Sequence, residues 1–422
     1  MVLTYDVIVI GAGPAGLAAA IEAKKTGAAR VLIIERNNEP GGILTQCIHN
    51  GFGSVIFKKD MPGPSYAHNF ITQARELEIE MLYDTMVIDI TPGRAIYATS
   101  KNGFMEFKAG AIVLAMGCRE RTRSQIRIPG TRPAGVFTAG MVQRMVNIEN
   151  LMPGKNFVIL GSGDIGMIMA RRLTLEGANV IKVVELMPFL TGLRRNYVQC
   201  LQDFNIPLEL STTIKTINGN SRVESVETVK VDESLKQIPG TENIIACDSV
   251  LLSVGLIPEN ELSKKAGVIL DPLTGGPEVD EKMATNIPGI FAAGNAVTIY
   301  DLVDYVSEAG FTAGKNAAIF AADKMKTPAD TVKILPGENV RTVVPQAINK
   351  KLSDDGQILM ELRVTKDFPS PVKIELTSGN NILLTFRERY ARPAEMITLK
   401  INPGLFAEKT ADVTGPIKVN VS

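Results

Sequence analysis

Hydrophobic positions in the first 120 residues follow the pattern of a sheet whose strands are buried on both faces. An apolar run at residues 7–10 leads into a glycine-rich turn and a helical pattern, and a second apolar run at residues 111–117 ends in glycine. Uninterrupted runs of this length are typical of parallel strands covered by helices. Between them we expect a second strand, a glycine-rich connection at 39–42, a helix at 66–78 and short strands at 81–90 and 96–107.

The same pattern recurs from about residue 130 to residue 256. An apolar run at residues 157–160 precedes a second glycine-rich turn and helix, and the section ends on a further apolar run with glycine at 249–255. Two sections built alike predict two α/β units, each with a parallel sheet covered by helices.

After Pro258 the pattern changes twice. Residues 287–295 form another apolar run ending in glycine, followed by a helix of small residues expected at 304–325. We interpret this stretch as chain that returns to complete the first unit. Beyond residue 326 apolar and polar residues alternate, which predicts a small all-β domain of the sandwich type. Its expected strands are 340–344, 359–364, 372–376, 382–386, 396–401 and 417–421, with turns at 378–381 and 402–404.

Each glycine-rich turn has the spacing of a dinucleotide-binding finger. The first glycine allows the tight turn from strand to helix, the second lets the backbone approach a pyrophosphate, and the third lets the helix pack close to the strand. The N-terminus of the helix directs N–H groups at the phosphates. Two complete fingers predict two bound dinucleotides, with glycines at Gly11, Gly13 and Gly16 and at Gly161, Gly163 and Gly166.

An acid ends the strand after each finger, Glu35 in the first unit and Glu185 in the second. A carboxylate at this position accepts hydrogen bonds from the ribose hydroxyls of an adenosine. At the second finger it favours NADH over NADPH, because a 2′-phosphate would be repelled. Arg194 and Arg195 lie too far downstream to reverse this preference unless a loop brings them back.

These patterns predict the fold class and the domains. The class is α/β: two Rossmann-like three-layer nucleotide-binding domains and a C-terminal all-β, sandwich-like domain. The 422 residues suffice for about three domains. The first nucleotide-binding domain is expected to be discontinuous, at 1–125 and 257–326, with the second at 126–256 and the β-rich domain at 327–422.

Charge and hydropathy narrow the partners. Basic and acidic residues number 45 each, which disfavours nucleic acid and anionic membranes as partners. Residues 7–20 resemble a signal peptide in hydropathy but lack a basic leader and contain the finger, so we expect a strand and a helix there. No run is long and uncharged enough for a transmembrane segment, and we expect a cytoplasmic location.

The four cysteines are far apart in the sequence, and no CxxC is present. This spacing lacks the pattern of a thioredoxin-type redox disulfide, and it gives no support for an iron–sulfur cluster or a zinc site, so no metal is expected. Redox chemistry must then depend on a bound organic cofactor. The cysteines are Cys47, Cys118, Cys200 and Cys247.

The order of parts over residues 1–326 resembles the two-dinucleotide-binding flavoproteins, the pyridine nucleotide-disulfide oxidoreductase superfamily of glutathione and thioredoxin reductases. The resemblance implies FAD at the first finger and NAD(P)H at the second. It also implies that residues 289–295 supply a hydrogen bond to the ribityl chain of the flavin. Asn295 stands where the family usually has aspartate, and its amide oxygen can still accept that bond.

The resemblance carries cofactor contacts onto individual residues of this chain. Those expected at FAD are Gly11, Gly13, Pro14, Ala15, Gly16, Glu35, Arg36, Gly42, Ile43, Val87, Ala115, Gly117, Gly294, Asn295 and Asp304. Those expected at NAD(H) are Gly161, Gly163, Asp164, Ile165, Gly166, Glu185 and Gly255.

Three loops, at residues 41–53, 114–123 and 301–308, are similar to those of a bacterial subfamily of NAD/FAD oxidoreductases. That subfamily is associated with FAD-dependent glycerol-3-phosphate dehydrogenases and is related to the FAD-binding subunits of opine oxidases and hydrogen cyanide synthase. Its β-rich tail is similar to residues 327–422. The resemblance implies a partner flavoprotein dehydrogenase, with the tail as a candidate docking surface; a homo-oligomer or a hetero-oligomer is compatible with it.

The departures from the disulfide reductases indicate the reaction. Those enzymes carry two cysteines shortly after a Gly-Gly pair, or a CxxC in the nicotinamide domain, and this chain has only Cys47 at the first place and none at the second. We therefore expect an FAD-dependent NAD(H) oxidoreductase without a redox disulfide. Hydride would pass between NADH and FAD, and electrons would pass between FAD and a second redox component.

Cys47 and His49 are the catalytic candidates. Cys47 follows Gly42 where the superfamily places residues beside the flavin ring, and His49 is close enough in sequence to perturb its thiol or to donate a proton. Equally, Cys47 is a small buried apolar residue and His49 a satisfied loop histidine. Two alternative functions stay open: an NADH peroxidase or oxidase that uses Cys47 as a sulfenic acid, and a binding protein with structural FAD and a vestigial nicotinamide site.

Asp304 is expected to be the N-cap of the small-residue helix, whose N-terminus points, by resemblance, at the flavin pyrimidine. His68 is interpreted as a structural residue at a helix start. The charged run of Arg119, Glu120, Arg121 and Arg123 is interpreted as a solvated hinge between the nucleotide-binding domains. Cys118, Cys200 and Cys247 are interpreted as core or loop residues without chemistry.

Overall fold

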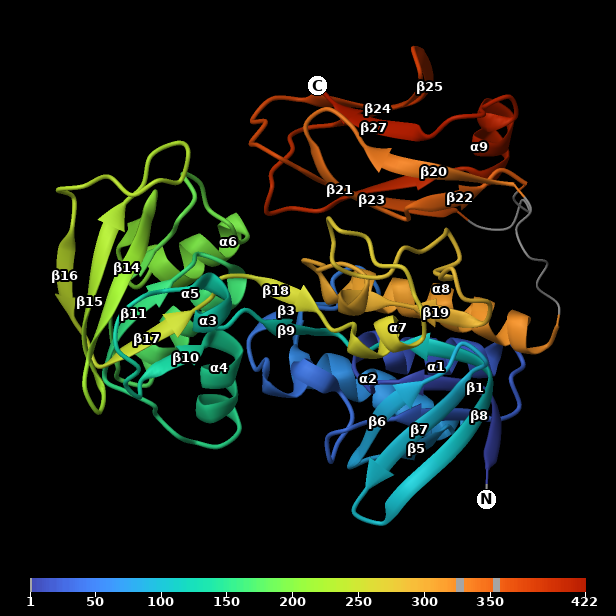
Figure 1. Cartoon of the computed structure of the whole chain (residues 1–422), viewed down its shortest axis with the longest axis horizontal. Helices are drawn as coiled ribbons and strands as arrows, with labels where there is room; N and C mark the ends of the chain where they lie inside the picture. The colour runs from blue at the N-terminus through green and yellow to red at the C-terminus, as the bar shows by residue number, and fades with distance from the viewer. Residues whose placement is uncertain (1, 324–329, 352–356) are drawn as a thin grey trace. The chain divides into compact units, whose positions relative to one another are not determined.

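The computed structural model describes residues 2–323, 330–351 and 357–422, and the chain divides into two compact units (Figure 1). The first unit contains residues 1–118 and 258–422, and the second contains residues 119–257. Two short strands, β9 (Cys118–Glu120) and β18 (Leu256–Pro258), span the positions where the chain passes from one unit to the other.

The first unit is built on a sheet with the strand order β5-β2-β1-β8-β7-β6, and β19 adds to β8. The central strand β1 runs parallel to both neighbours, with Val7 opposite Val31 and Ala111. A single twelve-residue strand, β8, covers positions where we expected two strands. The strands are β1 (Leu3–Ile10), β2 (Val31–Ile34), β5 (Glu80–Leu82), β6 (Thr85–Ile90), β7 (Ala95–Ser100), β8 (Gly103–Leu114) and β19 (Ile290–Ala292), and a hairpin is formed by β3 (Asn50–Phe52) and β4 (Met61–Pro62).

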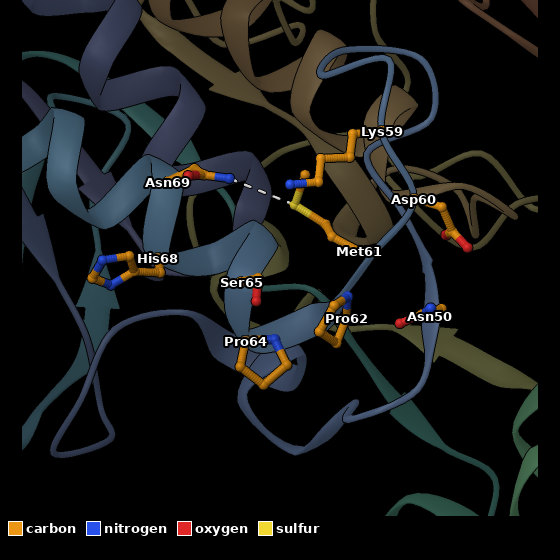
Figure 2. A pocket seen from close by; sticks show the side chains of 9 residues that line it. All are labelled: Asn50, Lys59, Asp60, Met61, Pro62, Pro64, Ser65, His68 and Asn69. Carbon is orange, nitrogen blue, oxygen red and sulfur yellow. Dashed lines mark hydrogen bonds between the residues drawn. The ribbon is translucent and has the colours of Figure 1, made fainter.

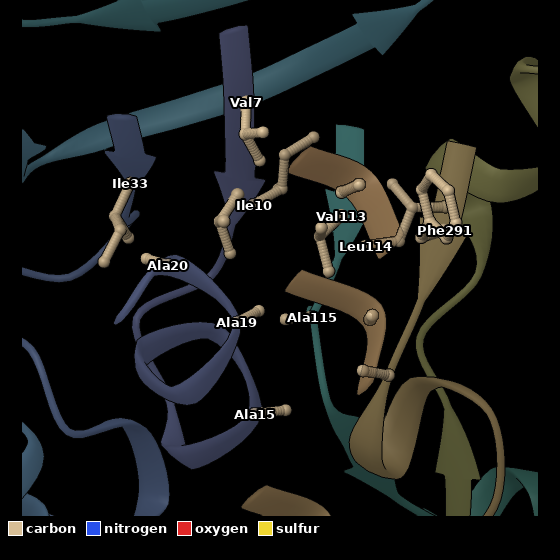
Figure 3. Close-up of a cluster of buried hydrophobic side chains, with 14 of the residues drawn as sticks. Val7, Ile10, Ala15, Ala19, Ala20, Ile33, Val113, Leu114, Ala115 and Phe291 are labelled. Carbon is tan, nitrogen blue, oxygen red and sulfur yellow. The ribbon is translucent and has the colours of Figure 1, made fainter. Parts of the chain in front are cut away.

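Helices of small residues close this sheet on one face. The return of the chain after residue 287 brings β19 alongside β8, with Phe291 opposite Val113, and then lays α8 across α1. A Cβ built on Gly310 or Gly314 would lie 2.3 or 2.0 Å from a carbonyl oxygen of α1, so only glycine permits this contact. Figure 3 shows the alanines of α1 packed against the strands. The helices are α1 (Pro14–Lys25), η1 (Gly42–Gln46), α2 (Gly63–Glu76), α7 (Glu261–Lys265), η3 (Gly294–Ala296) and α8 (Val303–Ala321).

The C-terminal part of the first unit has two sheets with their own apolar core, of order β22-β20-β27-β24-β25 and β21-β23-β26. Its described residues also include a helix, α9 (Pro403–Thr410), where we expected a turn. Asn402 and Pro403 favour turns, but they also favour the start of a helix, and the Asn402 side chain accepts from Leu405 N at 2.9 Å. The strands are β20 (Thr331–Pro336), β21 (Val340–Val344), β22 (Ala347–Asn349), β23 (Ile358–Val364), β24 (Val372–Ser378), β25 (Asn381–Glu388), β26 (Ile397–Ile401) and β27 (Ile417–Val421).

The second unit repeats the parallel arrangement with the order β10-β17-β11-β12-β13, and it adds an antiparallel sheet β14-β15-β16. Its central strands β11 and β17 are apolar after their first residues, as burial on both faces requires. Strands are β10 (Val136–Thr138), β11 (Asn156–Leu160), β12 (Asn179–Val184), β13 (Leu208–Glu209), β14 (Thr212–Gly219), β15 (Val223–Lys230), β16 (Asn243–Ala246) and β17 (Ser249–Leu252); helices are α3 (Arg123–Ile126), α4 (Ala139–Asn147), α5 (Asp164–Leu175), α6 (Arg194–Tyr197) and the π-helical η2 (Val198–Gln202).

Within the described residues, no helix combines the length and the apolar character needed to cross a bilayer.

Candidate functional site

The first finger lies in the turn between β1 and α1, and each glycine has a separate geometric role. A Cβ on Gly11 would lie 2.4 Å from the Ala115 oxygen, and one on Gly16 would lie 1.8 Å from the Gly11 oxygen, so both positions require glycine for packing. A Cβ on Gly13 would meet nothing nearer than 4.0 Å. The second glycine is therefore not needed for packing, and its absent side chain leaves the backbone open to a ligand.

Glu35 lies at the end of β2 and holds this finger. One carboxylate oxygen accepts from Ala12 N at 2.7 Å and the other accepts from Asn37 N at 2.8 Å. The side chain is buried, at 5% exposure. Each oxygen of a carboxylate has two lone pairs, so Glu35 retains acceptor capacity for ribose hydroxyls.

The Gly-Gly connection presses against the same finger. A Cβ on Gly42 would lie 2.9 Å from the Gly13 Cα, and Gly41 N donates to the Ala12 oxygen at 2.8 Å. Ile43, the next residue, is 54% exposed. Ile43 is therefore exposed directly after the residue that presses on the finger, at a position where we expected a contact with FAD.

Cys47 and His49 follow in the loop after η1. Cys47 is buried, and its thiol donates to the Ile43 oxygen at 3.3 Å. His49 is half-buried, with Nδ1 2.9 Å from the Asn50 oxygen and its ring centroid 5.1 Å from that of Phe52. Cys47 is thus bonded back to η1, and His49 contacts residues of β3.

Asp304 is not the N-cap of α8, contrary to our expectation. Leu302 occupies that position without a side-chain bond, and Asp304 lies in the first turn. Its carboxylate is fully buried and accepts from Gly53 N at 3.2 Å and from Ile56 N at 2.9 Å. The carboxylate therefore satisfies a neighbouring loop rather than its own helix, and it fixes that loop to the N-terminus of α8.

Asn295 and the start of α8 approach the first finger. A Cβ on Gly294 would lie 2.8 Å from the Ala15 Cβ, so this turn is in direct contact with α1. The Asn295 oxygen accepts from Tyr300 N at 3.1 Å, and its amide nitrogen lies 3.6 Å from the Cys118 sulfur. The sequence did not predict that Asn295 contacts Tyr300 and Cys118, because neither contact follows from a local pattern.

The remaining candidates of the first unit lie around this cradle. Ala115 and Gly117 follow β8, and Gly117 has a φ of +71°. Val87 is buried in β6, and Arg36 is exposed just after Glu35. His68 lies in the body of α2, one turn beyond the helix start where we expected it, with Nε2 3.5 Å from the Thr72 hydroxyl.

The second finger, between β11 and α5, reproduces the first. A Cβ on Gly161 would lie 2.0 Å from the Ser253 oxygen, and one on Gly166 would lie 2.6 Å from the Ser253 Cβ. Glu185 accepts from Ser162 N at 2.7 Å, as Glu35 does from Ala12. Gly163 and Ile165 lie between the two packing glycines, and Gly255 follows β17 with a φ of +96°.

Side chains that the sequence did not suggest surround this finger. The Ser162 hydroxyl donates to Glu185 at 2.7 Å, and the Thr191 hydroxyl lies 2.9 Å from the same carboxylate oxygen. Asp164 accepts from Leu193 N at 2.8 Å and from the Asn196 amide at 2.6 Å. The sequence did contain a sign that the segment after Glu185 returns to the finger. A glycine follows each acid at the same separation, Gly42 after Glu35 and Gly192 after Glu185.

Other polar candidates have structural partners within the second unit. Glu120 accepts from Gly140 N at 2.7 Å, and Arg123 donates to the Ile128 and Pro129 oxygens at 3.2 and 2.8 Å. Glu120 and Arg123 are half-buried and bonded within the second unit, and the interpretation of the run as a solvated hinge stays a prediction. Burial raises the pKa of the Cys200 and Cys247 thiols to about 11, which keeps them protonated near neutral pH.

A pocket of about 680 Å³ opens beside the Cys47 loop, between the β3–β4 hairpin and α2. Figure 2 shows its lining, in which Asn69 donates to the Met61 sulfur at 3.5 Å. The lining residues are Asn50, Lys59, Asp60, Met61, Pro62, Pro64, Ser65, His68 and Asn69.

Comparison with known proteins decides the family. The family model of pyridine nucleotide-disulphide oxidoreductases matches residues 5–313. The chain belongs to this family. Its members are oxidoreductases that use FAD and NAD(P)H, and both glycine cradles fit a dinucleotide, so this pyridine nucleotide-disulphide oxidoreductase is an FAD-dependent and NAD(P)H-dependent enzyme.

Relatives of this oxidoreductase differ in what their names describe. An opine oxidase subunit of Agrobacterium tumefaciens is 28% identical over 344 residues, which are 76% of this chain and 66% of that protein. Thioredoxin reductase of Listeria innocua is 28% identical over 74% of this chain and 92% of its own length. An alkyl hydroperoxide reductase subunit of Pseudomonas putida is 28% identical over 70% of this chain, and the match spans only 54% of that protein.

Solved structures confirm the predicted α/β fold with Rossmann-like sheets. Thioredoxin reductase of Lactococcus lactis has a TM-score of 0.63 at 22% identity, covering 76% of this chain and 99% of that one. Thioredoxin reductase of T. acidophilum has a TM-score of 0.62 at 24% identity, with the same shares of both chains covered.

Proposed function

We propose that this oxidoreductase takes electrons from NADH at the second finger and passes them through FAD at the first finger to a separate redox component, without a redox disulfide. NADH gives up a hydride and leaves as NAD⁺, and the second component receives the two electrons. The observation that carries the proposal is the pair of matched fingers, each with a buried acid bonded to its turn.

The residues at each finger have defined tasks in this proposal. The open backbone at Gly13 and the N-terminus of α1 bind the FAD pyrophosphate, and Glu35 orients the adenosine ribose. FAD supplies the group that accepts and releases the electrons. Glu185 binds the NADH ribose and disfavours a 2′-phosphate by like charge.

The cysteines support the absence of a dithiol relay. Cys47 has no second cysteine near it in sequence, and its buried thiol donates to a backbone oxygen. Cys200 and Cys247 are buried thiols whose raised pKa opposes thiolate formation. In this proposal no thiol stands between the flavin and the acceptor, and FAD bound at the first finger would exchange electrons with the acceptor directly.

The acceptor that we propose is a flavoprotein dehydrogenase of the glycerol-3-phosphate type, and the support is the resemblance of three loops to that subfamily. The similarity to the opine oxidase subunit is compatible with an enzyme that works beside another redox protein. Copurification of a partner flavoprotein from the natural host tests this part of the proposal.

Anaerobic mixing of the purified holoprotein with NADH or NADPH tests the central proposal. We expect the yellow absorbance to bleach at least tenfold faster with NADH, by the charge repulsion between Glu185 and a 2′-phosphate, and a preference for NADPH would contradict the role of Glu185. The same experiment distinguishes this proposal from a vestigial nicotinamide site, for which neither NADH nor NADPH would bleach the flavin absorbance.

Replacement of Cys47 tests the peroxidase alternative. The Cys47→Ser variant should retain dye-linked NADH oxidation, because no step of the proposal uses the thiol. Cys200→Ser is a matched control for the loss of a buried sulfur. A loss of peroxide-dependent NADH oxidation in Cys47→Ser alone would favour the alternative with a sulfenic acid.

A further inference from the structure

The sheet β21-β23-β26 of the C-terminal part touches the segment that leads into α8. Arg363 on β23 donates to the Ile299 oxygen at 3.0 Å and to the Pro393 oxygen at 3.2 Å, and it forms an ion pair with Asp301. The two charged side chains are 15% and 14% exposed. One guanidinium thus joins the C-terminal strands to the loop before α8, a task for which its rigid fork of donors is suited.

Asp301 strengthens this connection from the other side. Its second carboxylate oxygen accepts from Met396 N at 2.5 Å, just before β26. Both oxygens of Asp301 are therefore engaged by the C-terminal part. Residues 299–301 are held at their backbone and at their side chain, immediately before the N-terminus of α8.

Tyr300 extends the connection to the predicted flavin site. Its hydroxyl is hydrogen-bonded to the buried carboxyl of Glu361, two residues before Arg363 on the same face of β23. Its backbone N–H donates to the Asn295 oxygen at 3.1 Å. Tyr300 therefore links Glu361 to Asn295, with its hydroxyl bonded to the first residue and its backbone N–H bonded to the second.

Burial is the main reason that the pKa of Glu361 is raised to about 8, and the charges of Glu308 and Asp301 raise it as well. The hydrogen bond from Tyr300 and the charge of Arg363 act in the opposite direction. The carboxyl is therefore mostly protonated near neutral pH, and ionisation would add a charge beside two other carboxylates. Two further residues belong to this group of charges. Burial raises the pKa of Tyr305 and the charge of Glu361 adds to that rise, whereas burial raises the pKa of Glu308 and the charge of Lys400 lowers it.

A buried polar cluster of this kind adds little to stability that an apolar contact would not also add. It does restrict geometry, because a hydrogen bond is strong only within a narrow range of distance and angle. The arrangement that it restricts here is the loop between Asn295 and α8, which follows the Gly294 turn in contact with Ala15 of the first finger.

We propose that Glu361 and Arg363 of the C-terminal part are positioning residues for FAD: they hold residues 299–301 and, through Tyr300, the amide of Asn295. This inference rests on the proposed binding of FAD at the first finger. It assigns the C-terminal part a role in the flavin site itself, in addition to any role as a docking surface.

FAD affinity of the full-length protein tests the role of Arg363. We expect Arg363→Met to weaken FAD binding at least tenfold and Arg363→Lys to restore part of it, because lysine keeps the charge but lacks the fork. Lys350→Met is the matched control, because Lys350 is equally buried at 14% exposure and pairs with Asp330 at 3.1 Å within the C-terminal part. Equal FAD affinities of Arg363→Met and Lys350→Met would overturn the proposal.

The pH dependence of the visible spectrum of bound FAD tests the link through Tyr300 and does not require Arg363→Met to fold. The wild type should show a spectral change with a midpoint near the Glu361 pKa of about 8, and Glu361→Gln and Tyr300→Phe should abolish it. An unchanged transition in Glu361→Gln would overturn the proposal. If the wild-type protein itself takes up no FAD, the proposed function fails instead, and the two failures are distinguishable.

Discussion

The two fingers share one backbone design and differ in what covers it. In both, the acid at the end of the second strand accepts from the middle of the turn at 2.7 Å, and a later glycine presses on the turn. At the first finger the turn residue is Ala12, which has no polar side chain. At the second it is Ser162, whose hydroxyl bonds to Glu185 and lies 3.1 Å from the Thr191 hydroxyl.

This difference matches two modes of ligand use. A site whose cofactor stays bound needs few hydrogen-bond partners from the protein, because the cofactor itself bonds to the backbone groups. A coenzyme that exchanges in every turnover leaves its cradle repeatedly, and buried polar groups without partners are costly. If NADH binds at the second finger as we propose, the network around Glu185 would keep these polar groups hydrogen-bonded when the coenzyme is absent.

The largest expected effect comes from replacing the third glycine of each finger by alanine. In Gly16→Ala the new Cβ would lie 1.8 Å from a backbone oxygen, so we expect loss of bound FAD and a destabilisation of about 3 kcal/mol or more. Gly166→Ala should keep FAD and lose NADH affinity, because its Cβ meets Ser253 in the second unit. Flavin content after purification and NADH titration measure both; full flavin content in Gly16→Ala would contradict the packing argument.

The pH dependence of stability should differ in sign between the two units. Burial raises the pKa of Glu361 to about 8 and that of Glu281 to about 7, both in the first unit. Their stabilisation is complete below about pH 4.5, the unfolded value, and is lost as the pH rises to about 8. In the second unit burial opposes ionisation of Asp248, but bonds from Lys155 N, Ser249 and Asn156 N lower its pKa, so its stabilisation is lost as the pH falls.

Calorimetry from about pH 3 to about pH 9 measures this contrast. The unfolding free energy of the first unit should fall by a few kcal/mol towards high pH, since each pKa unit corresponds to about 1.4 kcal/mol. Glu361→Gln should flatten that slope. A fall of both units in the same direction would refute the assignment of these carboxyls.

Exchange of the acids sharpens the comparison at the level of affinity. Glu185→Gln removes the charge while it keeps one oxygen for Ser162, and we expect NADH affinity to fall about tenfold, or about 1.4 kcal/mol. The preference for NADH over NADPH should decrease as well. Glu35→Gln is the matched variant and should weaken FAD while it leaves NADH unchanged; an effect of either variant on the other ligand would break the parallel.

The smallest expected effect comes from the hydroxyl that distinguishes the turns. Ser162→Ala makes the second finger like the first and removes bonds to Glu185 and Thr191. We expect a loss of about 1 kcal/mol in the stability of the second unit. Ala12→Ser is the reverse change, and thermal unfolding of both variants shows whether the hydroxyl or its surroundings matter.

Local patterns predicted much of the fold. The strands at 340–344 and 417–421 have the bounds expected from alternation, and the strand, turn and helix at each finger follow from apolar runs and glycine. Helix α9 was missed because asparagine before proline is common to turns and helix starts. Asp304 was misassigned because an acid near a helix start has the same local appearance whether it caps its helix or bonds a distant loop.

Hydrophobic periodicity and local motifs did not identify the side-chain partners of distant segments. Arg363 and Asp301 are 62 residues apart, and neither lies in a motif that predicts the other. The network of Thr191 and Asn196 around the second finger depends on how residues 187–196 fold back, which periodicity does not determine. Sequence reasoning therefore located the cradles, and the structure supplied the side chains that complete them.

The sheet of the first unit has a consequence for the order of events at the ribosome. Strand β8 ends at Leu114, but its neighbour β19 starts only at Ile290, after the whole second unit has been made. At about 5–20 residues per second, synthesis of the intervening chain takes roughly ten to thirty seconds. During that interval the nascent N-terminal segment has an unpaired strand edge, while the inserted unit can already complete its own core.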